Sequence, residues 1–376
     1  MMSCAAIDHG IANMNMKNNL ARDLLRRRNR GMHSARSIAV GRSFKTQPRD
    51  VFVVTYPKCG TTWVTQIVHQ LRTGGDMSFG EITQVAPWDI LAHDCGQSLD
   101  AAHPNCDFRL FKSHEAAHRI AAPAKYIYVA RDPRDALVSF YYFLPSYFML
   151  PKNELSMEDF CEFIFAGRSH SGYIWEHLLG WWRRRHDADV LWLFFEDLKD
   201  DLPRQVRRVA AFVFDATARE GGSADFAGAK NRPTAREGGS ADFAGAKNRP
   251  TAREGGSADF AGAKNRPPAD LRRRIDIAIE RSSFEFMRAH AVQFDEHFTF
   301  AKRRAAMGLP RAAVYDGIGK VRAGGGGDGK MKVGARDLIP PSIMRRLEAK
   351  WREVLARPTG CANYAEWRRG WHAADD

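Results

Sequence analysis

Short apolar runs alternate with amphipathic segments over most of the chain. The run at 50–55 (DVFVVT) is rich in β-branched residues and ends at Tyr56-Pro57, which is typical of a buried strand. Residues 61–72 follow it with apolar side chains at helical spacing. The same reasoning predicts further strands at 108–111, 125–130 and 190–195, and an amphipathic helix at 201–214.

Parallel strands need crossover connections, and these connections place helices on both faces of the sheet. We therefore predict an α/β fold: a single domain with a central parallel sheet flanked by helices. The longest apolar runs, such as 126–130, are far too short to span a bilayer. The sequence thus predicts no transmembrane segment.

The N-terminal arm, residues 1–48, departs from this pattern. Residues 1–49 hold ten Lys and Arg against only Asp8 and Asp23, and the arm's one helical candidate is 19–28. The first interpretation is a mobile, flexible terminal arm. The alternative is an organelle transit peptide, because the arm is rich in Arg and poor in acids.

A perfect tandem repeat interrupts the domain that we assign to residues 49–376. Residues 217–233 read TAREGGSADFAGAKNRP, and the same 17 residues recur at 234–250 and 251–267. A unit with one Phe and a terminal Pro cannot bury enough surface to offset its ordering entropy. We predict that 217–267 is a flexible, solvent-exposed insertion.

The net charge of +13 over 376 residues first suggests a polyanion such as nucleic acid as the partner. Residues 1–49 contribute +8 of it and the repeats +3, so the remaining residues carry about +2 and predict no nucleic-acid partner. Six cysteines lie scattered without a CxxC pair, which suits a reducing compartment. We therefore expect a cytoplasmic protein, or an organellar one if the arm is a transit peptide.

The segment 55–63 (TYPKCGTTW) carries the strongest local motif. A strand ends, the chain turns through Gly60, and a helix begins at Thr61-Thr62. Unpaired backbone N–H groups and the helix dipole at such a turn bind phosphate, and Lys58 adds a donor. In the nucleoside-triphosphate loop Lys directly precedes Ser or Thr, whereas Lys58 precedes the glycine here. The alternative is an ordinary strand, turn and capped helix.

The segment 131–139 (RDPRDALVS) follows the predicted strand 125–130. Asp132 and Pro133 suit the first turn of a helix, which leaves Arg131 at the carboxyl end of the strand, where open α/β sheets bind ligands. Arg131 and Ser139 could hold a second phosphate together. The alternative is that Arg131 pairs with a carboxylate and that Ser139 is a solvated helix residue.

These motifs resemble the cytosolic sulfotransferase family, whose donor is 3′-phosphoadenosine 5′-phosphosulfate. Six segments resemble family motifs in the family's order: 56–63, 111–114, 131–142, 193–197, 282–287 and 322–330. They span most of the chain outside the arm and the repeats. The resemblance implies a sulfotransferase with this donor as co-substrate, a P-loop-like phosphosulfate loop, and a small-molecule acceptor as partner.

The resemblance also implies roles for three residues in the chemical step. His114 stands at the position of the family's general base, Lys58 at that of the donor to the leaving oxygen, and Lys112 at that of a residue that steadies the sulfuryl oxygens. A neutral histidine is a suitable base near pH 7, and cationic side chains can stabilise charge that develops in the transition state. We therefore expect no metal.

Binding residues follow from the same resemblance, with Trp63 and Phe284 as an adenine clamp and Arg131, Ser139 and Arg322 as a 3′-phosphate clamp. The expected nucleotide-binding residues are Lys58, Cys59, Gly60, Thr61, Thr62, Trp63, Arg131, Ser139, Phe195, Ser282, Phe284, Met287, Arg322, Ala323 and Gly324. The expected acceptor-site residues are Lys112, Ser113, His114, Trp88, Phe140 and Tyr142, of which the aromatic ones could equally belong to the core.

Several positions depart from the family pattern. Phe195 replaces a Tyr, Ala323 replaces a Lys, and Gly329 replaces a Trp. Residues 330–335 resemble the family's dimerisation motif only faintly, so we expect a monomer or a weak homodimer. These departures motivate an alternative function, a catalytically impaired nucleotide-binding or interaction protein on the same fold. A nucleoside-triphosphate-dependent kinase is a third hypothesis, disfavoured by the place of Lys58 and the lack of a clear magnesium-binding motif.

Overall fold

Four parallel strands form the centre of the molecule. The computed structural model describes residues 4–104, 106–151, 154–215, 268–315, 319–321 and 336–375. The strands are β1 (Val51–Thr55), β2 (Leu110–Ser113), β3 (Lys125–Ala130) and β4 (Val190–Phe194), in the order β2-β1-β3-β4. All three pairings are parallel. The predicted α/β fold with a central parallel sheet is confirmed.

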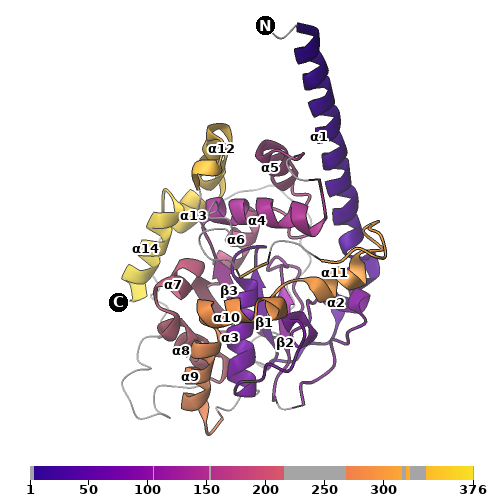
Figure 1. The fold of residues 1–376 in the computed structure, drawn as a ribbon. Helices are drawn as coiled ribbons and strands as arrows, with labels where there is room; N and C mark the ends of the chain where they lie inside the picture. Colours follow the sequence, from indigo (N-terminus) through magenta and orange to yellow (C-terminus); the bar gives the residue numbers. More distant parts are fainter. Residues whose placement is uncertain are drawn as a thin grey trace, which may run out of the picture.

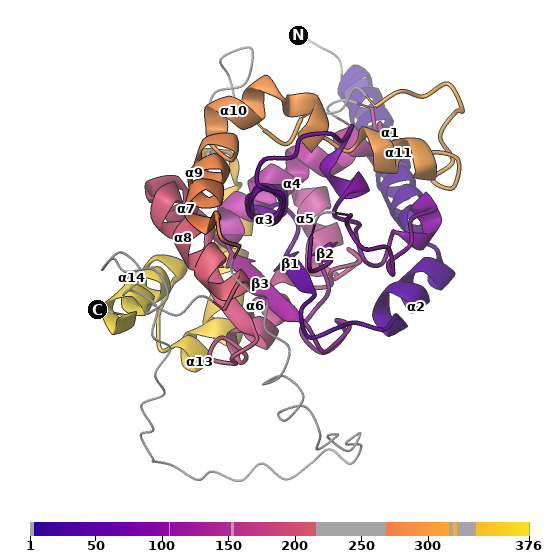
Figure 2. The same cartoon turned by 90° about the horizontal axis from the view of Figure 1, so that it is seen from below.

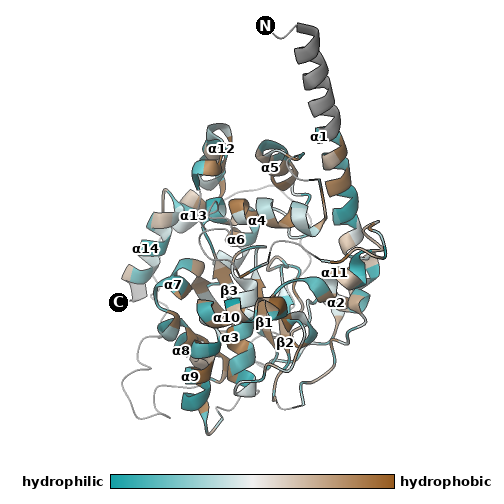
Figure 3. Cartoon of the chain, in the orientation of Figure 1, coloured by the Kyte–Doolittle hydropathy of each residue, from teal (hydrophilic) through white to brown (hydrophobic). Residues whose placement is uncertain are grey.

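Two hydrophobic cores sandwich the sheet because side chains alternate between its faces along each strand. On one face, Val51, Val53 and Ile127 pack against the helices α3 (Thr61–Thr73), α8 (Leu202–Val213) and α9 (Leu271–Arg281). The other face is rich in aromatic residues. It packs Phe52 and Tyr126 against α4 (Pro133–Tyr147) and α6 (Ile174–Trp182). Figure 3 shows the brown, apolar residues gathered on the strands and on the helices beside them.

Further helices surround these two layers (Figures 1 and 2). Helices α1 and α2 lie on one side of the molecule and α13 and α14 on the other in both views. The remaining helices are α5 (Met157–Phe165), α7 (Phe195–Asp200), α10 (Phe284–Ala289), α11 (His297–Arg303), α12 (Pro341–Trp351), α13 (Arg357–Thr359) and α14 (Tyr364–Asp375). Among the described residues, no helix is both long and apolar enough to cross a membrane.

The N-terminal arm differs from the mobile segment that its composition favours. It forms two helices, α1 (Cys4–Met32) and α2 (Ala35–Ser43). Ala21 and Leu25 are fully buried, and Arg303 donates hydrogen bonds to the backbone of Met32 and Gly31 at 2.9 and 2.8 Å. A narrow apolar stripe and hydrogen bonds to residues distant in sequence hold the arm in place. Apolar periodicity in the sequence does not reveal such contacts. The predicted repeat insertion, 217–267, lies outside the described residues.

Candidate functional site

A cavity of about 540 Å³ opens at the carboxyl ends of β1, β2 and β3. Its walls come from segments that are distant in sequence: the loop after β1, the end of β2, one face of α4 from its second turn to its end, and α10. The predicted residues that line it are Lys58, Gly60, Thr61, Thr62, Trp63, Trp88, Lys112, His114, Arg131, Ser139, Phe140, Phe195, Phe284 and Met287. The two predicted halves of the site therefore share one cavity.

Other predicted residues lie behind the lining. Ser113 faces the opposite side of its strand from Lys112, as alternation requires, and its Oγ accepts a hydrogen bond from the backbone of Glu115 at 3.1 Å. Tyr142 lies outside the lining, beside Tyr141, because residues 139, 140, 143, 144 and 147 form the face of α4 that lines the cavity. Cys59 and Ser282 are buried outside the lining, and Arg322, Ala323 and Gly324 lie outside the described residues.

The loop between β1 and α3 takes an unusual backbone path. Lys58 has φ +69° and Gly60, which precedes the first residue of α3, has φ +102°. A Cβ atom at Gly60 would lie 2.8 Å from Cδ2 of Phe195, so both the conformation and the contact require glycine. Thr61 shares a buried hydrogen bond of 2.5 Å with Thr55, which ties the helix start to the strand. The loop therefore presents the N-terminus of a 13-residue helix to the cavity.

We predict that Gly60→Ala weakens nucleotide binding by at least about tenfold and lowers stability by about 1–3 kcal/mol, because the new Cβ displaces Phe195 and strains the loop. Calorimetric titration with adenosine 3′,5′-bisphosphate and urea unfolding measure the two effects. Gly96→Ala is the matched control, since Gly96 also has positive φ (+72°) but a Cβ there meets nothing within 4 Å. Equal nucleotide affinity for both variants would contradict the role of Gly60.

The cysteine in this loop is a buried thiol. Cys59 is 1 % exposed, and burial raises the pKa of its thiol to about 12. The thiol is therefore protonated near pH 7 and a poor nucleophile. Its side chain contributes packing beneath the loop.

Arg131 connects the end of β3 to this loop. It is 6 % exposed, its NH1 donates to the Lys58 carbonyl at 2.6 Å, and its guanidinium lies 4.2 Å from the ring centroid of Phe195. Its buried Nε has no hydrogen-bond partner among the described residues. Because a buried unpaired donor is costly, an acceptor from a ligand would complete this site. A phosphate oxygen has the matching charge.

Aromatic side chains line the part of the cavity beside α3. The Trp63 indole donates to the carbonyl of Ser282 at 2.7 Å and packs edge-on against Phe195, with ring centroids 5.8 Å apart. Phe284, at the start of α10, is 38 % exposed although it lines the cavity. Met287 is buried one turn later. An exposed aromatic ring and a fixed indole that line the same cavity suit a planar base.

His114 is held in a defined tautomer just after β2. Its Nδ1 lies 2.8 Å from the backbone oxygen of Thr55. A carbonyl can only accept, so Nδ1 carries the proton and Nε2 keeps its lone pair. Burial, followed by the charge of Lys112, holds the pKa of His114 well below its usual range. The ring lines the cavity as a neutral imidazole that can accept a proton at Nε2.

Lys112 lies beside His114 and is also buried. Its Nζ donates to Glu296 at 3.1 Å and lies 4.2 Å from the ring centroid of Trp88. Burial lowers the pKa of Lys112, although Glu296 opposes this shift. Glu296 also meets Lys320 at 2.5 Å and accepts from Thr299 at 2.7 Å. The motifs did not reveal Glu296 or Lys320, because neither stands in a segment with a recognisable pattern.

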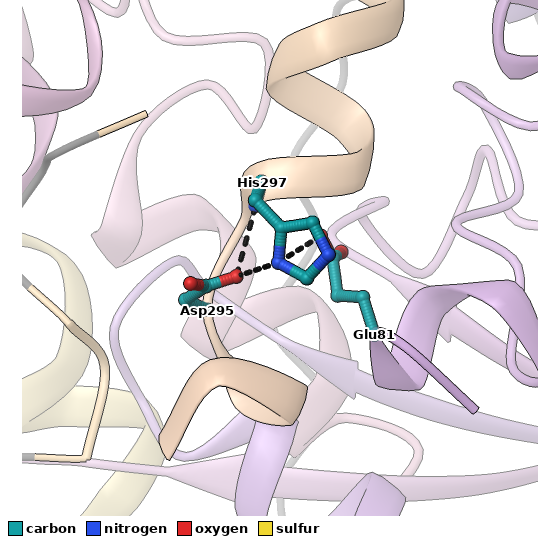
Figure 4. Close-up of side chains that lie close together, drawn as sticks. All are labelled: Glu81, Asp295 and His297. Carbon is teal, nitrogen blue, oxygen red and sulfur yellow. Dashed lines mark hydrogen bonds and ion pairs between the residues drawn. The ribbon is translucent and has the colours of Figure 1, made fainter. Parts of the chain in front are cut away.

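A cluster of possible metal ligands lies near this charge network. Oxygens of Glu81 and Asp295 and a ring nitrogen of His297 lie within 4.8 Å of one another (Figure 4). Hydrogen bonds within the protein account for this arrangement. His297 Nδ1 lies 2.5 Å from Asp295, and Glu81 accepts from the backbone of Phe298 at 2.5 Å and from the hydroxyl of Thr83. The cluster is explained without an ion.

Buried histidines give the site and its surroundings a marked pH dependence. Burial is the main cause of the low pKa of six of them, and it lowers the pKa of His69 and His177 to about 3. The other four are His33, His103, His114 and His170. In the unfolded chain a histidine binds its proton near pH 6.5. Below that pH the unfolded state therefore holds more protons, and stability falls as pH falls.

We predict that the free energy of unfolding decreases from pH 7 to pH 5.5, with each such histidine contributing up to about 1.4 kcal/mol per pH unit below its unfolded pKa. Four carboxyls, Glu81, Asp89, Asp189 and Glu196, oppose the trend because burial raises their pKa values. Burial raises the pKa of Glu81 to about 7 and of Asp89 to about 8, so they bind protons in the folded state first. Six histidines outnumber four carboxyls, so the net effect is destabilisation by acid. Urea unfolding across this range checks it, and a rising midpoint on acidification would contradict it.

Comparison with known proteins finds similar sequences over the first half of the described domain. A sequence model described as a sulfotransferase domain matches residues 48–220. The chain is 31 % identical over 180 residues to sulfotransferase 1 family member D1 of Rattus norvegicus and 30 % identical over 182 residues to human sulfotransferase 1C2. Each alignment covers 46 % of this chain, and 61 % and 60 % of those proteins. The chain thus spans about three-fifths of the length of these curated relatives.

Solved structures show the same fold. Retinol dehydratase in complex with androsterone and the inactive cofactor PAP aligns with a TM-score of 0.51 and 21 % identity, over 83 % of this chain and 82 % of that one. Retinol dehydratase in a complex with retinol and PAP aligns with a TM-score of 0.52 and 19 % identity, over 86 % of each chain. Residues 48–220 therefore match a sulfotransferase domain, and the described chain has the fold of these solved structures.

Proposed function

We propose that this chain transfers a sulfuryl group from 3′-phosphoadenosine 5′-phosphosulfate to a hydroxyl or amine of a small acceptor. The observation that carries the proposal is one cavity that joins a phosphate-binding helix terminus to a buried, neutral imidazole with a fixed tautomer. The sulfotransferase names of the relatives and the PAP found with retinol dehydratase support this donor.

The proposed chemistry assigns one step to each residue. The acceptor hydroxyl loses its proton to Nε2 of His114 as its oxygen attacks the sulfur, and the bond from sulfur to the bridging phosphate oxygen breaks. Lys58 and the backbone amides at the start of α3 stabilise the charge on the leaving phosphate. Lys112 stabilises the sulfuryl oxygens. Its ammonium group donates to Glu296, and it must direct another of its N–H groups to the ligand. These cationic groups take the place of a metal.

The nucleotide end of the proposed site rests on stacking and on charge. Trp63 and Phe284 would hold the adenine between them, while Arg131 and Ser139 would bind the 3′-phosphate. The unpaired Nε of Arg131 supplies a donor that no described residue satisfies. Arg322, Ala323 and Gly324 stay predicted members of this part of the site.

Nucleotide titration tests the donor. We predict that Arg131→Met weakens adenosine 3′,5′-bisphosphate by about 10- to 100-fold but weakens adenosine 5′-phosphate much less, because only the first ligand has the 3′-phosphate. The loop contact to the Lys58 carbonyl is lost for both ligands, so the difference between them isolates the phosphate. Isothermal calorimetry on the full chain measures both affinities. Equal losses, or tighter binding of ATP than of the bisphosphate by the wild type, would contradict this assignment.

The second candidate is a nucleotide-binding or interaction protein on the same fold. Phe195 favours this candidate. It stands where the family has a Tyr, so its ring packs against Arg131 but it has no hydroxyl to offer the site. Bisphosphate binding without transfer to any acceptor would support this candidate. We also propose that the protein works in the cytoplasm, as a monomer or weak homodimer, with an organellar location as the alternative.

A further inference from the structure

We propose that His33 reads a second hydrogen-bonding group on the acceptor, so that the cavity favours acceptors carrying a further hydroxyl or carbonyl a short distance from the reacting hydroxyl. This inference rests on the proposed function, because it concerns the acceptor of that same site. It assigns to the N-terminal arm a part in acceptor selection.

The end of α1 forms a wall of the cavity. Asn29, Met32 and His33 all line it, next to the segment 169–171. His33 is only 5 % exposed although it borders this open space. Its ring packs edge-on against His170 and Trp88, with centroids 4.2 and 4.8 Å apart. The ring is therefore confined on two sides by other lining residues.

Hydrogen bonds hold this wall in place. The Asn29 side-chain amide donates to the carbonyl of Arg168 at 2.9 Å, and Nε2 of His170 donates to the carbonyl of Asn29 at 2.9 Å. Arg303 donates to the carbonyl of Met32 at 2.9 Å. Because these bonds already hold the wall rigid, a residue on it loses little conformational entropy when a ligand binds. Such rigidity favours specific recognition.

The described residues leave at least one ring nitrogen of His33 without a hydrogen-bond partner. Neither ring nitrogen has a partner of normal geometry in the described part of the chain. The backbone of Ile90 is near enough to influence the ring, but one backbone group can serve only one of the two nitrogens. Burial, followed by His170, keeps the pKa of His33 well below its usual range, so the ring is neutral. A neutral imidazole offers one donor and one acceptor, which suits a hydroxyl or a carbonyl.

The distance between His33 and the proposed base determines what size of acceptor can contact both residues. Trp88 contacts both imidazoles edge-on, His33 at 4.8 Å and His114 at 5.0 Å between ring centroids. The two imidazoles thus lie no further apart than these separations combined. A compact bicyclic acceptor can lie along Trp88 and reach both, with an apolar body against the aromatic lining and a polar atom at each end.

The experiment compares naphthalene-2,6-diol with 2-naphthol, which lacks the second hydroxyl. Binding of each probe to the full chain is followed by fluorescence titration with adenosine 3′,5′-bisphosphate present, so the readout does not depend on turnover. We expect the wild type to bind the diol about five- to tenfold more tightly than 2-naphthol, the size of one hydrogen bond. His33→Phe keeps an aromatic ring but removes both nitrogens, so the diol should lose its advantage.

Two further variants separate recognition from packing. His33→Gln restores a donor and an acceptor and should recover part of the preference, whereas a residue that only packs would show no such rescue. His118→Phe replaces an exposed histidine that does not line the cavity, and it should leave the preference at its wild-type value. Thermal unfolding and bisphosphate binding confirm that each variant is folded.

Three results would overturn the inference: equal affinities of the wild type for the two probes, an unchanged preference in His33→Phe, or no binding of either probe. Failure of the proposed function has a different signature. In that case no labelled sulfuryl group reaches either naphthol, while the diol preference and its loss in His33→Phe persist.

Discussion

Replacing His114 by alanine should lower the turnover of sulfuryl transfer by about 10²- to 10⁴-fold, the usual contribution of a general base. The affinity for adenosine 3′,5′-bisphosphate should change little, because the role proposed for His114 is to take a proton from the acceptor and not to bind the nucleotide. Turnover should fall because the hydrogen bond from Nδ1 to the Thr55 carbonyl leaves Nε2 as the proton acceptor, and alanine has no such group. Initial rates at saturating donor, paired with calorimetry, measure both quantities.

The control for this variant is His118→Ala, which removes an exposed histidine outside the cavity lining and should keep wild-type turnover. The pH profile adds an independent check. Since the pKa of His114 lies well below its usual range, turnover per folded molecule should not fall as pH decreases through 6.5. Wild-type turnover in His114→Ala would remove this residue from the chemical step.

Lys58→Met should reduce turnover by about 10²- to 10³-fold, the cost of removing one donor aimed at charge that develops in the transition state. The affinity for the bisphosphate product should fall by a smaller factor, since the bridging oxygen carries its extra charge only as the bond breaks. Methionine keeps the apolar stem against Phe143, whose ring lies 3.8 Å from the ammonium nitrogen. Turnover and affinity are measured on the same preparation.

Lys302→Met provides the matched change of charge at an exposed position outside the cavity lining, and its turnover should match that of the wild type. If the two lysine variants behave alike, the charge of Lys58 has no special role. If Lys58→Met loses affinity and turnover by equal factors, the lysine would bind the nucleotide uniformly instead of stabilising the leaving group.

The sheet and the loop after β1 could be predicted from the sequence because their signals are local. The apolar run at 50–55 coincides with β1 (Val51–Thr55), and the helix predicted at 201–214 coincides with α8 (Leu202–Val213). The strand predicted at 108–111 is displaced to Leu110–Ser113. There the backbone N–H of Lys112 donates to the carbonyl of Pro87 at 2.9 Å, and its carbonyl accepts from the N–H of Asp89 at 3.0 Å. A charged residue therefore belongs to the strand, although apolar runs alone do not extend that far.

The arm and the charge network depend on contacts between distant segments, which no local pattern carries. Leu25 is buried in the core next to charged neighbours, and Arg28 donates to the carbonyl of Met149 at 3.0 Å. Glu296 lies 184 residues from Lys112. His33 was one of several histidines without a motif around it. Only the fold places it beside Trp88, whose ring also contacts the proposed base.

The most direct test of the central claim follows label from donor to acceptor. The full chain is incubated with sulfur-labelled 3′-phosphoadenosine 5′-phosphosulfate and a panel of hydroxyl and amine acceptors that includes 2-naphthol. The account predicts labelled acceptor and released adenosine 3′,5′-bisphosphate in equal amounts, and no labelled acceptor with His114→Ala. A folded wild-type chain that binds the bisphosphate but labels none of the acceptors would contradict it.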